Sequence, residues 1–308
     1  MELFRNVNVD WMSKKWYFLG FSLIGTVAGL ISIFFINHIP LGVDFKGGTI
    51  VYVQFQQDTS EDTVRTAVQN AGVKDARIQS YDVASKHEMI IALEQKAMDS
   101  SAIETSKQTI IAALDSSPLK GQYSVFNTEI VHPQVSQQLK KQALLATLYS
   151  LAGMLVYIAF RFEFIYGVAA VVAVLHDTLF TVGMFSLTNT EMSLTVIAAL
   201  LTLIGYSMND TIVVFDRIRE NIKLMRRASL TEIVNASINQ TLSRTVLTSG
   251  LTFLTVASLF FFGGPVLHGF SLALVIGIMV GTYSSIAVAA PMLVAYQNWR
   301  SEQAKGTR

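Results

Sequence analysis

The chain has 308 residues, of which 51% are hydrophobic and only 15% are charged, whereas about 25% are charged in a typical soluble protein. The mean hydropathy of +0.44 argues against a soluble globular enzyme. A net charge of +1 provides no basic surface for nucleic acid. Cysteine is absent, which excludes disulfides, thiolate metal sites and a cysteine nucleophile.

Six segments are apolar and long enough to cross a bilayer, which requires about 20 residues each. The first is too long for the apolar part of a signal peptide, so we interpret it as a retained span. The predicted spans are residues 16–36, 143–160, 165–187, 192–215, 245–262 and 268–296.

The polar stretch 37–142, between the first two spans, predicts a small folded domain. Alternating and β-branched residues indicate strands, and apolar residues at helical spacing indicate two helices. The predicted order is strand 49–57, helix 60–71, strands 77–83 and 89–94, helix 101–114 and strand 122–131. This β-α-β-β-α-β order is the ferredoxin-like motif. The predicted fold is therefore an α-helical membrane protein with six transmembrane helices and one ferredoxin-like α+β domain between spans 1 and 2.

Lys and Arg are distributed unequally between the two sides of the predicted spans. They gather in 1–15, in the loop after span 4 and in 297–308, whereas the turns 188–191 and 263–267 contain none. The positive-inside rule then predicts cytoplasmic termini at 1–15 and 297–308, and a periplasmic domain at 37–142. Residues 143–296 would hold spans 2–6. Lys140 and Lys141 are exceptions, but they adjoin a long loop, where the rule is weak.

Ionisable groups inside a span are costly and mark candidate functional sites. Asp210, next to Asn209, interrupts the apolar fourth span. Its simpler interpretation is a carboxylate at a helix end that already lies in water. Arg244 lies at the start of span 5, and the alternatives for it are an interfacial anchor or a partner for Asp210.

His176 and Asp177 lie near the centre of span 3. Adjacent helical residues face about 100° apart, so we expect them not to share one partner and one of them to bond a neighbouring helix. A structural role is the simpler interpretation. The GxxxG pairs Gly25 with Gly29, and Gly277 with Gly281, predict close helix packing.

Motifs of soluble enzymes are missing from the chain. It has no phosphate-binding loop, no HExxH and no GxSxG, so we predict no enzyme activity, no cofactor and no metal site. Gly47 and Gly48 indicate a turn into the first strand. An intramembrane aspartyl protease that uses Asp177 and Asp210 is a weak alternative, because neither residue stands in a YD or GxGD signature: His176 precedes Asp177, and Asn209 precedes Asp210.

Three motifs stand out along the chain: GVDFKGG at 42–48, GYSMNDTIVVFDRIREN at 205–221 and SRTVLTS at 243–249. They resemble the SecF family of bacterial protein export, which belongs to the resistance–nodulation–division superfamily. Their order around a predicted ferredoxin-like domain extends the resemblance over essentially the whole chain.

The resemblance implies a bacterial inner-membrane protein that pairs with SecD. It implies cooperation with the SecYEG channel and the SecA motor, and use of the proton-motive force to promote movement of unfolded exported polypeptides. Asp210 and Arg244 match the family residues implicated in proton movement. The alternative is half of a proton-coupled efflux transporter of the same superfamily, which the small polar outer segment disfavours.

Overall fold

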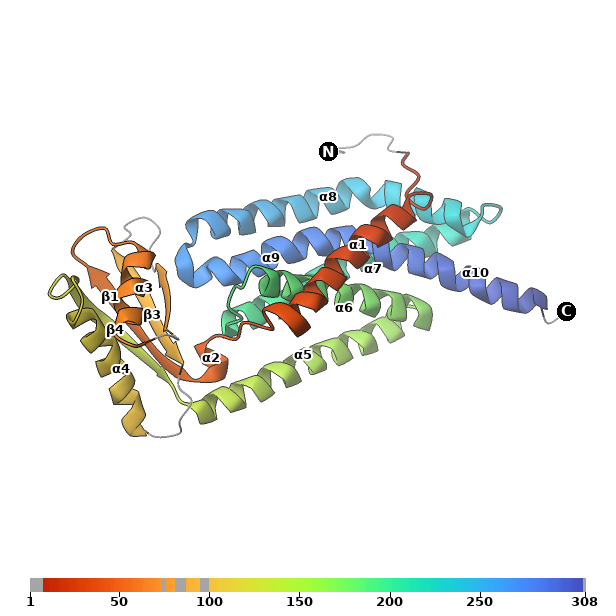
Figure 1. Cartoon of the computed structure of the whole chain (residues 1–308). Coiled ribbons are helices and arrows are strands. Elements are labelled where there is room, and N and C mark those ends of the chain that lie inside the picture. The colour runs from red at the N-terminus through yellow and green to blue at the C-terminus, as the bar shows by residue number, and fades with distance from the viewer. Residues whose placement is uncertain (1–7, 74–75, 81–86, 95–99, 307–308) are drawn as a thin grey trace.

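The computed structural model describes residues 8–73, 76–80, 87–94 and 100–306. In this part of the chain, six helical segments are long and apolar enough to cross a membrane. They form an elongated bundle, and a small β domain lies at one end of it (Figure 1). The predicted class, a six-helix membrane protein with one α+β domain, is confirmed.

Several of the long helices continue beyond the apolar stretches that predict them. α8 begins at Leu230, directly after a capping box: the Ser229 hydroxyl accepts from the Glu232 N–H, and the Glu232 carboxylate accepts from the Ser229 N–H. The spans are α1 (Lys15–Ile31) with the π-helical turn η1 (Ser32–Ile36), α5 (Pro133–Arg161), α6 (Phe164–Leu187), α7 (Leu194–Leu224), α8 (Leu230–Phe262), and α9 (Gly264–Ser284) continued by the π-helical turn η2 (Ser285–Ala289) and α10 (Ala290–Gly306).

The β domain contains one four-stranded sheet covered by two helices. Its elements are α2 (Val43–Lys46), β1 (Gly48–Phe55), α3 (Glu61–Asn70), β2 (Ala76–Ser80), β3 (Glu88–Glu94), α4 (Ser100–Asp115) and β4 (Tyr123–Val131). The strand order is β2-β3-β1-β4 with every neighbouring pair antiparallel. This confirms the predicted β-α-β-β-α-β order. Residues 81–83 of the second predicted strand lie outside the described residues.

Close helix packing depends on glycine, as the GxxxG pairs predict. A Cβ on Gly29 of α1 would lie 2.8 Å from the Gly183 Cα of α6. A Cβ on Gly281 of α9 would lie 3.0 Å from the Ser207 Cβ of α7. Glycine therefore brings α9 close enough to α7 for their polar side chains to meet.

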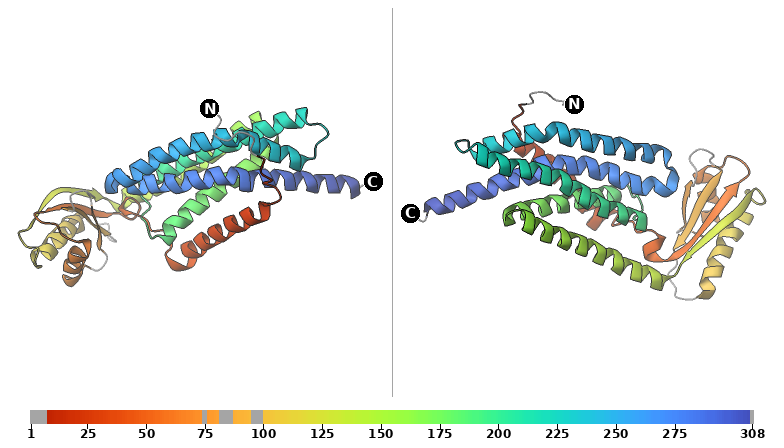
Figure 2. Two further views of the ribbon diagram at one scale, coloured as in Figure 1. Left: turned by 90° about the horizontal axis from the view of Figure 1, so that it is seen from above. Right: turned by 180° about the vertical axis from the view of Figure 1, so that it is seen from behind.

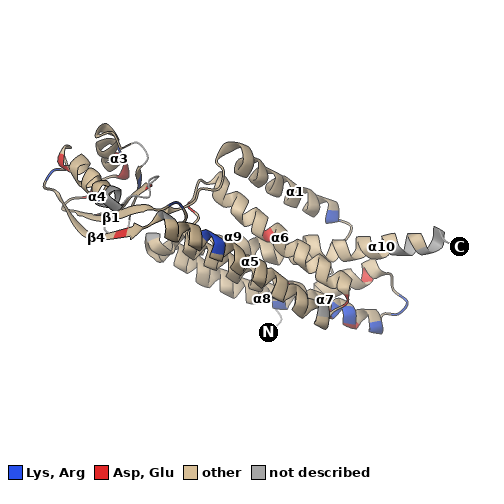
Figure 3. Ribbon diagram, turned by 90° about the horizontal axis from the view of Figure 1, so that it is seen from below, with Lys and Arg blue, Asp and Glu red and all other residues tan. Residues whose placement is uncertain are grey.

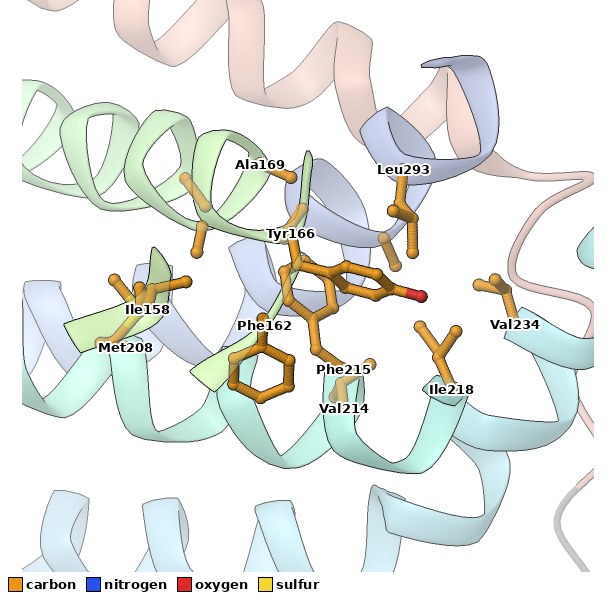
Figure 4. Close-up of a cluster of buried hydrophobic side chains, with 14 of the residues drawn as sticks. Ile158, Phe162, Tyr166, Ala169, Met208, Val214, Phe215, Ile218, Val234 and Leu293 are labelled. Atoms are coloured by element: carbon orange, nitrogen blue, oxygen red, sulfur yellow. The ribbon is translucent and has the colours of Figure 1, made fainter. Parts of the chain in front are cut away.

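Two apolar clusters fill the bundle, one toward each end. The cluster farther from the β domain joins α5, α6, α7 and α10, with Phe162, Tyr166, Phe215 and Leu293 in contact (Figure 4). The cluster nearer the β domain includes Phe185, Leu200 and Leu274. A layer of polar side chains lies between them.

The two ends of the bundle differ in charge. The loop between α7 and α8 and the end of α10 lie far from the β domain (Figure 2). Lys and Arg gather at this end, near the end of α7, whereas the middle of the bundle is almost free of charged residues (Figure 3). The few charged residues in the middle are therefore the first candidates for a functional site.

Candidate functional site

Asp210 lies in the middle of α7 and is 1% exposed. Its Oδ2 accepts a hydrogen bond of 2.7 Å from the Ser249 hydroxyl of α8 and one of 3.2 Å from the Thr282 hydroxyl of α9. Within the described residues, no salt bridge holds this carboxyl group. Asp210 is therefore buried between three helices, which excludes the simpler interpretation of a helix-end carboxylate in water.

The other two polar residues predicted near Asp210 form no hydrogen bond or ion pair with it within the described residues. Asn209 is exposed on α7, and Arg244 is exposed on α8. In the part of the chain that the structure describes, no ion pair joins Arg244 to Asp210. Ser249, five residues after Arg244, is the α8 residue that reaches the carboxylate. The two predicted proton-site residues thus lie on neighbouring helices without direct contact in this conformation.

Asp177 is completely buried in α6 and contacts two other helices directly and a third through His176. Its Oδ2 accepts from the hydroxyls of Ser207 on α7 and Ser284 on α9, at 2.5 and 2.8 Å. Its Oδ1 lies 2.9 Å from His176 Nδ1, and His176 Nε2 lies 2.5 Å from the Ser22 hydroxyl of α1. The two side chains have different partners on neighbouring helices, and they also contact each other, which sequence reasoning did not predict.

Both carboxylates belong to one polar layer. Ser207 and Asp210 lie on one face of α7, three residues apart, and Thr282 and Ser284 both lie on α9. No hydrogen bond joins the two carboxyl groups to each other within the described ranges. No cluster of three or more His, Asp or Glu suited to a metal occurs among the described residues either. The layer offers buried carboxylates, hydroxyls and one imidazole, which are groups that bind and release protons or relay them.

The segment 42–48 joins the β domain to the N-terminal end of α7, the helix that carries Asp210. Asp44 Oδ2 accepts a hydrogen bond of 2.9 Å from the Leu194 N–H, the first residue of α7. The Gly42 N–H donates to the Met192 carbonyl at 2.9 Å. Gly48 begins β1 where any Cβ would lie 2.3 Å from the Leu93 carbonyl oxygen, so only glycine fits. Gly47, at φ +79°, forms the expected turn.

A second link joins the β domain to the turn between α6 and α7. Arg77 of β2 forms an ion pair with Glu191, with 2.5 Å between the guanidinium and the carboxylate. The N-terminal end of α7, the helix that carries Asp210, is therefore held by two separate parts of the β domain.

Sequence reasoning did not identify the hydroxyl partners Ser249, Thr282, Ser207 and Ser284, or the acceptor role of Asp44. The available signal was a set of Ser and Thr residues at helical spacing in otherwise apolar helices. Such residues also occur on exposed faces, for example Thr255 of α8, so spacing alone does not select the functional ones.

Comparison with known proteins places these features in a family. Residues 97–299 match the model described as "Protein export membrane protein SecD/SecF, C-terminal", and residues 32–59 match the "SecD/SecF GG Motif". The chain is 52% identical to the "Protein translocase subunit SecF" of Koribacter versatilis, over 98% of this chain and 95% of that protein. The chain belongs to the SecF family. It is also 43% identical to the SecF of Calditerrivibrio nitroreducens, over 97% of this chain and 98% of the relative.

Solved structures support the same assignment. The crystal structure of SecDF from Thermus thermophilus, described as a translocon-associated membrane protein, matches with a TM-score of 0.81 and 39% identity. That match covers 95% of this chain but only 39% of the SecDF chain. SecF therefore corresponds to one part of the longer fused protein, which supports SecD as its partner.

These relatives establish the general function. The chain is a multi-pass membrane protein and an accessory subunit of the Sec protein translocation machinery. The relatives do not favour the alternative of an efflux half-transporter, because the full-length matches are translocase subunits.

Proposed function

We propose that this SecF chain couples the proton-motive force to the movement of exported polypeptides, with Asp210 as the group that carries the proton. The observation that carries the proposal is a fully buried carboxylate, in the middle of a spanning helix, held by two hydroxyl groups. Hydroxyls accept or donate, so they can hold either protonation state of the carboxyl group. The energy of the site depends on its charge, because an ionised group is costly in the membrane interior.

The proposed orientation follows from the positive charges. The end with the α7–α8 loop and the α10 terminus carries most of the Lys and Arg of the bundle (Figure 3), so it faces the cytoplasm under the positive-inside rule. The β domain then lies in the periplasm, and the membrane is the bacterial inner membrane. A proton that crosses from the periplasm to the cytoplasm provides about 2.3 kcal/mol per 100 mV of membrane potential.

The orientation predicts the side from which single cysteines react, because the chain has no cysteine of its own. Lys120 lies in an exposed turn of the β domain, and Arg226 is exposed in the α7–α8 loop. We expect Lys120→Cys to react with an impermeant thiol reagent added to intact spheroplasts, and Arg226→Cys to react only after lysis. The reverse labelling pattern would refute the orientation.

The bundle exposes a polar face that fits a partner within the membrane. Arg244, Thr248, Thr255 and Ser258 recur at helical spacing on α8 and are all exposed. Asn209 is exposed on the neighbouring helix α7. Polar residues on an intramembrane surface normally face protein or water rather than lipid. We infer that SecD covers this face and that Arg244 acts there.

The β domain has an edge that suits an extended polypeptide. β4 lies at one end of the strand order and, among the described strands, pairs only with β1. Phe126 and Ile130 of β4 are exposed. An unfolded chain can add to such an edge through backbone hydrogen bonds. The exported polypeptide would make this contact, while the SecYEG channel and the SecA motor supply passage and ATP-driven pushing.

Movement at Asp210 reaches the β domain through α7. This helix runs without interruption from Asp210 to Leu194, whose N–H donates to the Asp44 carboxylate. A shift or rotation of α7 on proton binding therefore acts directly on the segment that leads into β1.

We expect Asp44→Ala to weaken the coupling between the β domain and the bundle. The variant removes the acceptor of the Leu194 N–H, and it leaves the N-cap Ser193, Asp210 and its hydroxyls unchanged. Export stimulated by the proton-motive force should fall severalfold at normal protein abundance, whereas Asp62→Ala, an exposed acidic residue of α3, should have no effect. Export by Asp44→Ala at the wild-type rate would show that this contact does not transmit movement.

A further inference from the structure

The buried face of α8 carries a regular series of hydroxyl groups. Ser237, Thr241, Thr245 and Ser249 follow one another at intervals of four residues, and each is at most 8% exposed. An interval of four keeps side chains on nearly the same face of a helix. We call these four residues the hydroxyl column. It extends from the end of the bundle that we assign to the cytoplasm to the carboxylate of Asp210.

The cytoplasmic end of the column is connected to exposed polar groups. Asn221 Nδ2 donates to the Ser237 hydroxyl at 2.9 Å and to the side-chain carbonyl of Gln240 at 2.8 Å. Gln240 is exposed and also accepts from the Arg217 guanidinium at 2.6 Å. The series of polar groups thus begins at the protein surface.

The inner end of the column is the site itself, because Ser249 donates to Asp210. Between these ends, Thr245 is unusual. Ser237 and Thr241 donate to backbone carbonyls four residues earlier, the ordinary arrangement for hydroxyls in a helix. The Thr245 hydroxyl is 3% exposed and has no hydrogen-bond partner among the described residues. A buried hydroxyl without a hydrogen-bond partner is costly, so we expect a polar ligand next to the Thr245 hydroxyl.

The spacing of the column fits water. Four residues of α-helix rise about 6 Å, too far for a direct hydrogen bond between neighbouring hydroxyls. Two O–H···O bonds of about 2.8 Å each span nearly that distance, so one water molecule can join each pair.

The hydroxyl column does not continue along α8 beyond Ser249, the residue that bonds Asp210. The next buried residue on this helix is Val256, which packs in the apolar cluster with Leu200 and Leu203 of α7. Of the two halves of the α8 buried face, only the cytoplasmic one is lined by hydroxyls. The polar route along this helix therefore leads from Asp210 to one side of the membrane.

We propose that the hydroxyl column is a water-binding path through which protons pass between Asp210 and the cytoplasm. This inference rests on the proposed function, and it assigns the cytoplasmic half of the proton route. A proton that leaves the Asp210 carboxyl group passes to the next water or hydroxyl oxygen, which releases its own proton to its neighbour. Each relay group is restored, and one proton emerges near Gln240. The path is separate from Arg244, which lies on the exposed face of the same helix.

Thr245→Val tests the path, because valine keeps the shape of threonine and removes the hydroxyl. The variant is reconstituted in proteoliposomes with the SecD partner, and proton flux is followed with a pH-sensitive dye. We expect proton flux to fall about tenfold or more, because a modest increase in the free-energy barrier to proton transfer past position 245 has an effect of this size. The matched control is Thr147→Val on α5, where the hydroxyl likewise donates to a backbone carbonyl of its own helix, that of Ala143; its flux should equal that of the wild type.

Two further results separate this inference from the proposed function. Asp210→Asn blocks proton flux if the proposed function is right. Wild-type flux in Thr245→Val together with blocked flux in Asp210→Asn would therefore refute the path along the hydroxyl column and leave the proposed function standing. Wild-type flux in both variants would refute both proposals. Thr245→Cys adds a readout independent of flux: a small water-soluble thiol reagent should label it from the cytoplasmic side. Failure of that reagent to label it, while Arg226→Cys reacts, would show that the path is dry.

Discussion

Asp210→Asn is expected to abolish the stimulation of export by the proton-motive force while the protein still assembles. Asparagine has nearly the same size and accepts hydrogen bonds from Ser249 and Thr282, but it has no titratable proton. The measurement is translocation of a precursor into inverted membrane vesicles, with and without an imposed proton-motive force. ATP-driven translocation without that force should be unchanged.

Two other variants show whether the loss in Asp210→Asn is due to the missing carboxyl group at this position. Asp210→Glu retains a carboxyl group and should keep part of the stimulation, although its longer side chain disturbs the contacts with α8 and α9. Asp216→Asn is the matched control, because Asp216 is an exposed residue of the same helix, paired with Arg161 and Arg219. It should behave like the wild type. Full stimulation in Asp210→Asn at normal abundance would remove this residue from the mechanism.

Arg244→Met should produce the second large loss of export stimulated by the proton-motive force. The change keeps a long side chain and removes the charge from the polar face of α8. Arg244 does not touch Asp210 in this conformation, so we expect the guanidinium to act on a partner acidic group or to approach Asp210 in another state. A charge left without its partner in a low-dielectric site costs several kcal/mol, which explains the size of the expected effect.

Arg244→Lys distinguishes the functional role from simple anchoring. A lysine anchors a helix at the interface as well as an arginine does, but it does not reproduce the planar guanidinium. We expect Arg244→Lys to lose most of the stimulated export, and Arg226→Lys, in the exposed loop, to lose none. Wild-type export by Arg244→Lys would favour the anchor, and wild-type export by Arg244→Met would exclude a proton-coupling role.

The sequence was sufficient to predict the fold because the membrane restricts the possible structures. Apolar runs of about 20 residues allow few alternatives to spanning helices. Strand alternation and two amphipathic helices predicted the β-α-β-β-α-β order. The predicted span 245–262 covers only part of α8, which begins at Leu230 after the capping box at Ser229.

The partners of the buried carboxylates were beyond sequence reasoning because they depend on how each helix is rotated about its axis. Ser249 and Thr255 are both hydroxyl residues of α8, yet one bonds Asp210 and the other is exposed. A helix with hydroxyls on several sides has no clear polar face. The contact between His176 and Asp177 was missed for a different reason. The angle of about 100° between adjacent residues describes the directions in which they leave the helix axis, and flexible side chains can still turn toward each other.

The central claim is that the proton on Asp210 controls the position of the β domain, and a distance measurement tests it most directly. Spin labels at Lys120→Cys, in the β domain, and at Arg226→Cys, in the α7–α8 loop, report this position in the reconstituted complex with SecD. We predict a distance distribution that shifts between acidic and alkaline pH, and a single distribution, independent of pH, when Asp210→Asn is added. An equal pH-dependent shift with and without Asp210, or no shift in either protein, would contradict the account.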